Sequence, residues 1–84
     1  LITKQKELLN TYHRLKEWLK EYEESGSKLY SEILRTAELG FESGEIDFYR
    51  FAASTETAFQ LKLEYLNNLL EFNSVTLELN YLSK

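Results

Sequence analysis

The stretch LGFESGEIDFYRF, residues 39–51, decides the fold of this chain, because it holds two of the three glycines of a sequence without proline. Long amphipathic patterns lie on both sides of it. Gly44 suits the positive φ of a tight reversal, since glycine has no Cβ to clash. Glu45 and Asp47 then fall in the first turn of the next helix, where carboxylates favour the positive end of the helix dipole. We predict a helix–turn–helix reversal with its turn at 42–45.

The first arm carries an apolar seam with the spacing of a coiled coil. Its members follow one another at intervals of four and three, namely Leu8, Tyr12, Leu15, Leu19 and Tyr22. Gly26 interrupts this rhythm, and a second register then begins with Tyr30, Leu34, Ala37 and Phe41. The helix therefore either bends here or breaks into two. We expect a break or kink at residues 25–27, with Ser27 able to cap the helix that resumes.

The second arm differs in kind, because its apolar residues lie on two overlapping seams. One seam consists of Phe59, Leu63, Leu66, Leu70 and Leu77, and the other of Ala58, Leu61, Tyr65, Phe72, Val75, Leu79 and Leu82. One partner helix cannot cover both, so this arm is expected to be central in a bundle or to pack between two neighbours. The predicted fold is all-α, a long antiparallel helical hairpin with a first arm over 3–41 and a second over 46–82. Each arm should be about 55–60 Å long at 1.5 Å per residue.

Composition sets further limits. The chain has 84 residues, no cysteine and a net charge of −4. A chain this short buries only about 60–65% of its unfolded surface, so we expect it to self-associate. Its ten basic residues are scattered among fourteen acids, which argues against nucleic acid as a partner. The first residue is not methionine, and we expect the hairpin to be a piece of a longer polypeptide.

The sequence offers little for catalysis or metal binding. His13 is the only histidine and has Glu17 one turn away, but a single pair at i and i+4 is incomplete for zinc. The acidic run at 21–25 is expected to be a solvated helix segment, and Trp18 is expected to cover the core. No serine or threonine has an obvious base, and no glycine-rich phosphate loop is present. We therefore predict no catalytic residue, no metal site, no cofactor and no enzymatic activity.

Residues 37–84 resemble the last helical repeat of the TolC-like outer-membrane efflux proteins. The shared pattern is an alanine, an aromatic residue, a variable pair, a glycine, a hydrophobic turn and a long helix with a Tyr-Asn-type ending. The GEID form at 44–47 and the LNYLSK ending at 79–84 are most similar to versions that accompany, or are fused to, heavy-metal RND pumps of the CzcA and CusA type. The arm at 14–34 resembles the family more loosely.

The resemblance implies a location and two partners. In that family this reversal forms the tip of the periplasmic α-helical tunnel and meets the periplasmic adaptor (membrane fusion) protein, while an RND inner-membrane pump supplies the energy for export. The adaptor-contact positions map onto Phe41, Ser43, Gly44, Glu45, Ile46 and Asp47. Here Ser43 replaces the usual valine and Glu45 the usual leucine or threonine. The expected function is thus a structural part of an efflux channel that exports heavy-metal cations. The alternative is a free-standing coiled-coil oligomerisation or scaffold module without a transport role.

Overall fold

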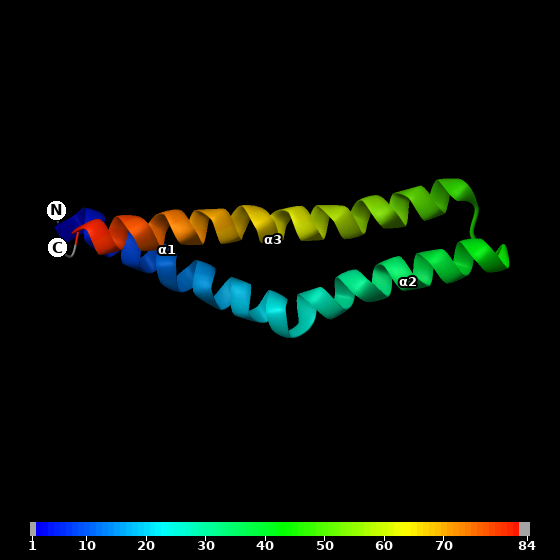
Figure 1. Cartoon of the computed structure of the whole chain (residues 1–84), viewed down its shortest axis with the longest axis horizontal. Coiled ribbons are helices and arrows are strands. Elements are labelled where there is room, and N and C mark those ends of the chain that lie inside the picture. Colours follow the sequence, from blue (N-terminus) through cyan, green and yellow to red (C-terminus); the bar gives the residue numbers. More distant parts are fainter. Residues whose placement is uncertain (1, 83–84) are drawn as a thin grey trace.

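The computed structural model describes residues 2–82 and shows a long antiparallel hairpin of helices (Figure 1). The first arm consists of α1 (Ile2–Glu21), a π-helical turn (Tyr22–Gly26) and α2 (Ser27–Ser43), and the second arm is the single helix α3 (Phe48–Leu82). The molecule measures 59 × 21 × 16 Å, which agrees with the predicted arm length. Within residues 2–82 there is no strand, so the predicted all-α hairpin is confirmed.

The turn lies two residues later than predicted. The first arm extends to Ser43 and α3 begins at Phe48, so the connection covers 44–47 and not 42–45. Gly44 has φ 81° and ψ 5°, as expected for the residue that reverses the chain. Neither Glu45 nor Asp47 lies in the first turn of α3, as was predicted for both. Glu45 lies in the connection, and Asp47 lies immediately before α3, where its Oδ1 accepts a hydrogen bond of 2.8 Å from the backbone N–H of Arg50. A carboxylate in this capping position satisfies a free helix N–H directly, and it therefore fixes where α3 begins.

One of the two seams of α3 faces the first arm. It is the seam of Ala58, Leu61, Tyr65, Phe72, Val75, Leu79 and Leu82, all of them buried or half-buried. The first-arm seam lies opposite, and the rings of Tyr12 and Phe72 stack with their centroids 5.0 Å apart. The most buried side chains are Leu15, Leu19, Tyr22, Ala37, Ala58 and Val75. The core is therefore a strip along the hairpin, as the heptad spacing predicts.

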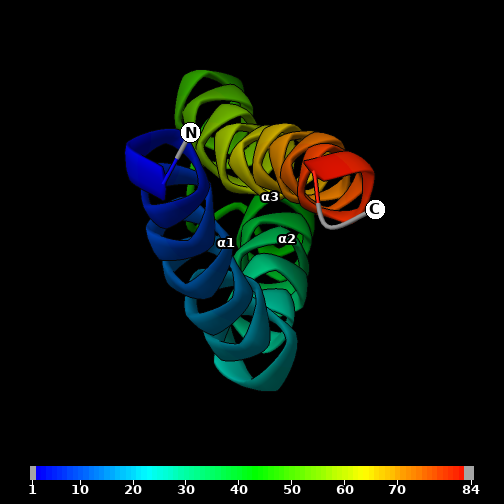
Figure 2. The same ribbon diagram turned by 90° about the vertical axis from the view of Figure 1, so that its left-hand side faces the viewer.

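The first arm bends near residues 22–26, but it does not break. Figures 1 and 2 show the arm bowing away from α3 at this point. Ser27 is not a helix cap, because its φ and ψ are helical (−67° and −34°) and its hydroxyl donates to the Glu23 carbonyl at 3.4 Å. The predicted kink is thus confirmed, whereas the predicted cap is wrong.

The π-helical turn has a cause in the spacing of the seam. Four residues of the first arm, Leu15, Tyr22, Tyr30 and Ala37, all lie toward α3. The first two are seven residues apart and so are the last two, but Tyr22 and Tyr30 are eight residues apart. Leu29, which would continue the first register, is exposed. A π-helical turn takes up one extra residue and keeps the helix continuous. The arm can therefore hold its apolar side chains on one face across the change of register.

Aromatic side chains fill the space where the arm bows outward. The ring of Tyr22 stacks on Tyr65 at 4.3 Å and on Trp18 at 5.8 Å. Lys62 Nζ lies 5.6 Å from the centre of the Tyr65 ring and completes the cluster. Gly26 is required beneath this stack, because a Cβ there would lie 2.6 Å from Cδ2 of Tyr22. The Tyr22 hydroxyl is buried and has no hydrogen-bond partner among the described residues.

Candidate protein-binding surfaces

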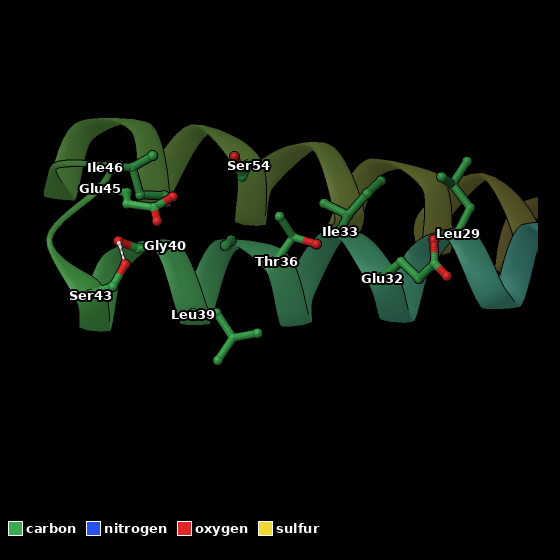
Figure 3. A pocket seen from close by; sticks show the side chains of 11 residues that line it. Leu29, Glu32, Ile33, Thr36, Leu39, Gly40, Ser43, Glu45, Ile46 and Ser54 are labelled. Atoms are coloured by element: carbon green, nitrogen blue, oxygen red, sulfur yellow. Dashed lines mark hydrogen bonds between the residues drawn. The ribbon is translucent and has the colours of Figure 1, made fainter.

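The end of the hairpin that carries the turn, residues 38–50, is called the tip. Its backbone is held by caps on both helices. The N–H of Gly44 donates to the Phe41 carbonyl at 3.2 Å, and the N–H of Ile46 donates to the Gly40 carbonyl at 3.2 Å. The Ser43 hydroxyl also donates to the Gly40 carbonyl at 3.2 Å (Figure 3). These bonds satisfy carbonyl groups that a helix end leaves without partners, so the tip is a defined shape.

Gly40 has a packing role in the tip. It lies inside α2, and a Cβ there would be 3.3 Å from Cγ1 of Ile46. The missing side chain lets Ile46 fold back over the last turn of α2, and Ile46 is half-buried as a result. An apolar contact of this kind commonly accompanies a glycine-terminated helix.

The tip exposes aromatic rings beside carboxylates. Phe41 stacks on Phe51 at 4.9 Å and meets Phe48 edge-on at 6.1 Å. Phe48 is nevertheless 68% exposed and Tyr49 82%. The tip has a formal net charge of −3, because it holds four carboxylates and one guanidinium. These belong to Glu38, Glu42, Glu45, Asp47 and Arg50. A binding partner of this surface would need apolar side chains together with positive charge.

The structure brings the predicted contact residues together at this end of the hairpin. Phe41 and Ser43 lie in the last turn of the first arm, and Gly44 and the exposed Glu45 begin the connection. Ile46 and Asp47 serve the turn, as described above. Sequence reasoning missed Phe48 and Tyr49 as surface residues. The helical period of α3 could have found Tyr49, because residues two positions apart point in different directions and Phe51 faces the first arm. Phe48 lies three positions before Phe51 and shares its face, so the period gives no signal for it.

An open groove of about 730 Å³ runs beside the turn, between α2 and the start of α3. Leu29, Ile33 and Ile46 contribute apolar walls, while Glu32 and Glu45 stand at its rim. Figure 3 shows Ile33 directed toward α3 and Leu39 directed away from it. The groove lies open along the hairpin, so it resembles the space between packed helices more than a small-molecule pocket.

The second seam of α3 is exposed along its length. We call it the outer seam, and it consists of Phe59 (56% exposed), Leu63 (50%), Leu66 (44%), Leu70 (66%), Leu77 (70%) and Tyr81 (74%). Five of these residues were predicted as a seam, and Tyr81 extends it. The first arm covers the other seam and leaves this one facing outward. Asn73 occupies the seam position between Leu70 and Leu77, and the other seam positions are apolar. Exposed apolar surface of this length is uncommon on soluble monomers, so the outer seam is a candidate protein-binding surface.

Features that point to catalysis or metal binding are few in the described part of the chain. No group of three or more His, Cys, Asp or Glu side chains in residues 2–82 is arranged to hold a metal ion. His13 is exposed, and its ring meets that of Tyr12 edge-on at 5.4 Å. Trp18 is half-buried against Tyr22, as predicted. None of the helices described for residues 2–82 has both the length and the hydrophobicity to cross a membrane.

Comparisons with protein-family models, with curated proteins and with solved structures gave no match to this chain. The surfaces themselves, the tip and the outer seam, are therefore the basis for the function proposed below.

Proposed function

We propose that this hairpin is a structural element of the periplasmic α-helical tunnel of a TolC-like efflux channel, with its tip in contact with the periplasmic adaptor protein. The observation that carries the proposal is the outer seam. A helix that buries one apolar seam and exposes a second is built to pack between two neighbours, as a helix in a tunnel wall does.

The shape of the hairpin supports the same function. At 59 Å its length is nearly three times its next dimension, and the turn stands at the extreme end. A wall made of such hairpins would present all its tips at one rim, where a second ring of proteins could dock. The exposed rings of Phe48 and Tyr49 and the net negative charge of the tip give that rim a surface suited to protein binding.

Transport in this proposal is passive at the hairpin. The wall provides a path for heavy-metal cations, and an RND pump in the inner membrane supplies the energy. The hairpin itself needs no catalytic residue, metal or cofactor for this role. Its contribution is rigidity along the arms and recognition at the tip.

A second function, a free-standing coiled-coil oligomerisation or scaffold module, is favoured by one observation. The outer seam has heptad spacing from Phe59 to Leu77, which alone is sufficient for association of helices. The tip distinguishes the two functions, because a scaffold module requires no partner there.

Photocross-linking in the cell envelope tests the proposal. A photoreactive residue at Tyr49 should cross-link the longer parent protein to an adaptor, whereas one at the exposed arm residue Glu17 should not. Cross-links to an adaptor from Glu17 and none from Tyr49 would contradict docking at the tip. Cross-links between copies from both positions, with no adaptor, would favour the scaffold module.

A further inference from the structure

The spacing of the outer seam allows two copies of the chain to cover each other. Phe59, Leu63, Leu66, Leu70 and Leu77 follow intervals of four, three, four and seven, so they lie on one stripe of α3. We propose that two copies pair through their outer seams, with the two α3 helices antiparallel, to form a four-helix dimer. This inference goes beyond the proposed function and does not rest on it.

The outer seam supplies most of the area of a standard protein–protein interface. The six side chains of the outer seam are 44–74% exposed. With about 150–250 Å² for a large apolar residue, they offer roughly 650 Å² per copy, against about 800 Å² per partner in a standard interface. Side chains that flank the seam would supply the remainder.

The flanks of the seam do not oppose pairing. Asn73 stands within the seam, between Leu70 and Leu77, and is its one polar position from Phe59 to Leu77. The exposed residues beside the seam include Gln60, Lys62, Asn67 and Ser74, of which Lys62 is the only charged one. The acids Glu64, Glu71 and Glu78 follow a different stripe at intervals of seven. In an antiparallel pair centred between Leu66 and Leu70, Lys62 of one copy lies beside Thr76 of the other, so no like charges meet.

The distribution of charge favours the antiparallel orientation. A parallel pair would place two tips side by side, each with a net charge of −3. An antiparallel pair directs each tip toward the opposite end of the other hairpin. There residues 3–20 hold five basic and two acidic side chains, and α3 adds Glu71 and Glu78 beside them, so the net charge of this end is +1. Unlike charges at the two ends therefore select the orientation.

Dimerisation is tested by sedimentation equilibrium of the full 84-residue chain. We expect a monomer–dimer equilibrium at micromolar concentration. Leu70→Asp should weaken the dimer at least about 100-fold, since each dimer contains this apolar side chain twice. Leu70 is 66% exposed, so the hairpin core should remain and the helical circular dichroism should be unchanged. Glu71→Asn is the matched control and should leave dimerisation as it is.

Orientation is tested by single cysteines, which the chain lacks otherwise. Asn67→Cys lies close to the two-fold axis of the antiparallel pair and should form a disulfide-linked dimer readily, whereas Gln60→Cys should not. A mixture of Gln60→Cys and Ser74→Cys should cross-link as a heterodimer. A clean monomer at high micromolar concentration, a dimer that survives Leu70→Asp, or equal cross-linking of the 60 and 67 variants would each overturn the proposal.

The antiparallel dimer has a consequence for the proposed tunnel wall. Its two tips point in opposite directions, whereas a wall needs all tips at one rim. The dimer and the wall therefore use the outer seam in ways that exclude each other. Loss of the dimer in the sedimentation experiment would leave the Tyr49 cross-linking result unaffected, so the two proposals fail separately.

Discussion

Gly26→Ala is expected to destabilise the hairpin, although alanine is usually better than glycine in a helix. Gly26 has φ −66° and ψ −36°, so its backbone suits alanine, and the replacement alone would stabilise by about 1 kcal/mol. The added Cβ, however, would lie 2.6 Å from Cδ2 and 3.0 Å from Cγ of Tyr22. The contact is with the base of a buried ring, which cannot swing away as the end of a flexible chain could.

The magnitude follows from what the Tyr22 ring must give up. Overpacking of a core costs about 1–3 kcal/mol, and a displaced aromatic stack costs about 0.5–1.5 kcal/mol more. After the gain in helix propensity is subtracted, the free energy of unfolding should fall by about 1–3 kcal/mol. Urea unfolding followed by circular dichroism at one fixed protein concentration measures this difference.

Two further variants isolate the cause. Ser25→Ala gains helix propensity at the neighbouring exposed position without meeting the ring, so it should be neutral or slightly stabilising. In a Tyr22→Ala background the clash is absent, and Gly26→Ala should then stabilise by about 1 kcal/mol. A stabilising Gly26→Ala in the original sequence would refute the reasoning.

Three other changes have definite expected outcomes. Gly44→Val should lower the free energy of unfolding by about 1–3 kcal/mol, measured by thermal melts, because φ 81° strains a β-branched residue. The cause is backbone strain alone, since no atom lies within 4 Å of the added Cβ. A Gly44→Val melt equal to that of the original sequence would contradict this. Asp47→Ala should lower the free energy of unfolding by about 0.5–2 kcal/mol, because it removes the hydrogen bond that caps the N–H of Arg50. Asp47→Asn keeps an acceptor oxygen and should be nearly neutral. Equal losses of stability for both variants would point to charge instead of capping. Tyr22→Phe should raise the urea midpoint, since it removes a buried hydroxyl without a partner, and a clear loss of stability would mean that the hydroxyl is hydrogen-bonded in solution.

Much of the fold follows from the spacing of apolar residues. The intervals from Leu8 to Tyr22 predicted the first-arm seam, and the change of register at Tyr30 predicted the bend. The positive φ of Gly44 could be predicted because the chain has no proline and few glycines with which to reverse. These features depend on local geometry, which the sequence determines directly.

Other features depend on contacts between distant residues and could not be predicted. The first arm was predicted to end at Phe41, but α2 continues to Ser43, and Gly40 lies within it with Ile46 packed where a Cβ would stand. The π-helical turn keeps Tyr22 and Tyr30 on one face, where the sequence allowed a break equally well. The two seams of α3 have similar composition, so only the packed structure distinguishes the covered seam from the exposed one. Phe48 was not recognised as part of the tip surface, because it shares a helix face with Phe51 and only the packed structure shows that it remains exposed.

The π-helical turn also makes the first arm unusually tolerant of the deletion of one residue. Elsewhere in a packed helix the loss of one codon rotates every following side chain by about 100° and removes the apolar face from its partner. Between Tyr22 and Tyr30 the loss of one residue would instead reduce an interval of eight to seven and restore an unbroken heptad. Relatives of this chain could therefore differ in length by one residue at this position while keeping the same hairpin.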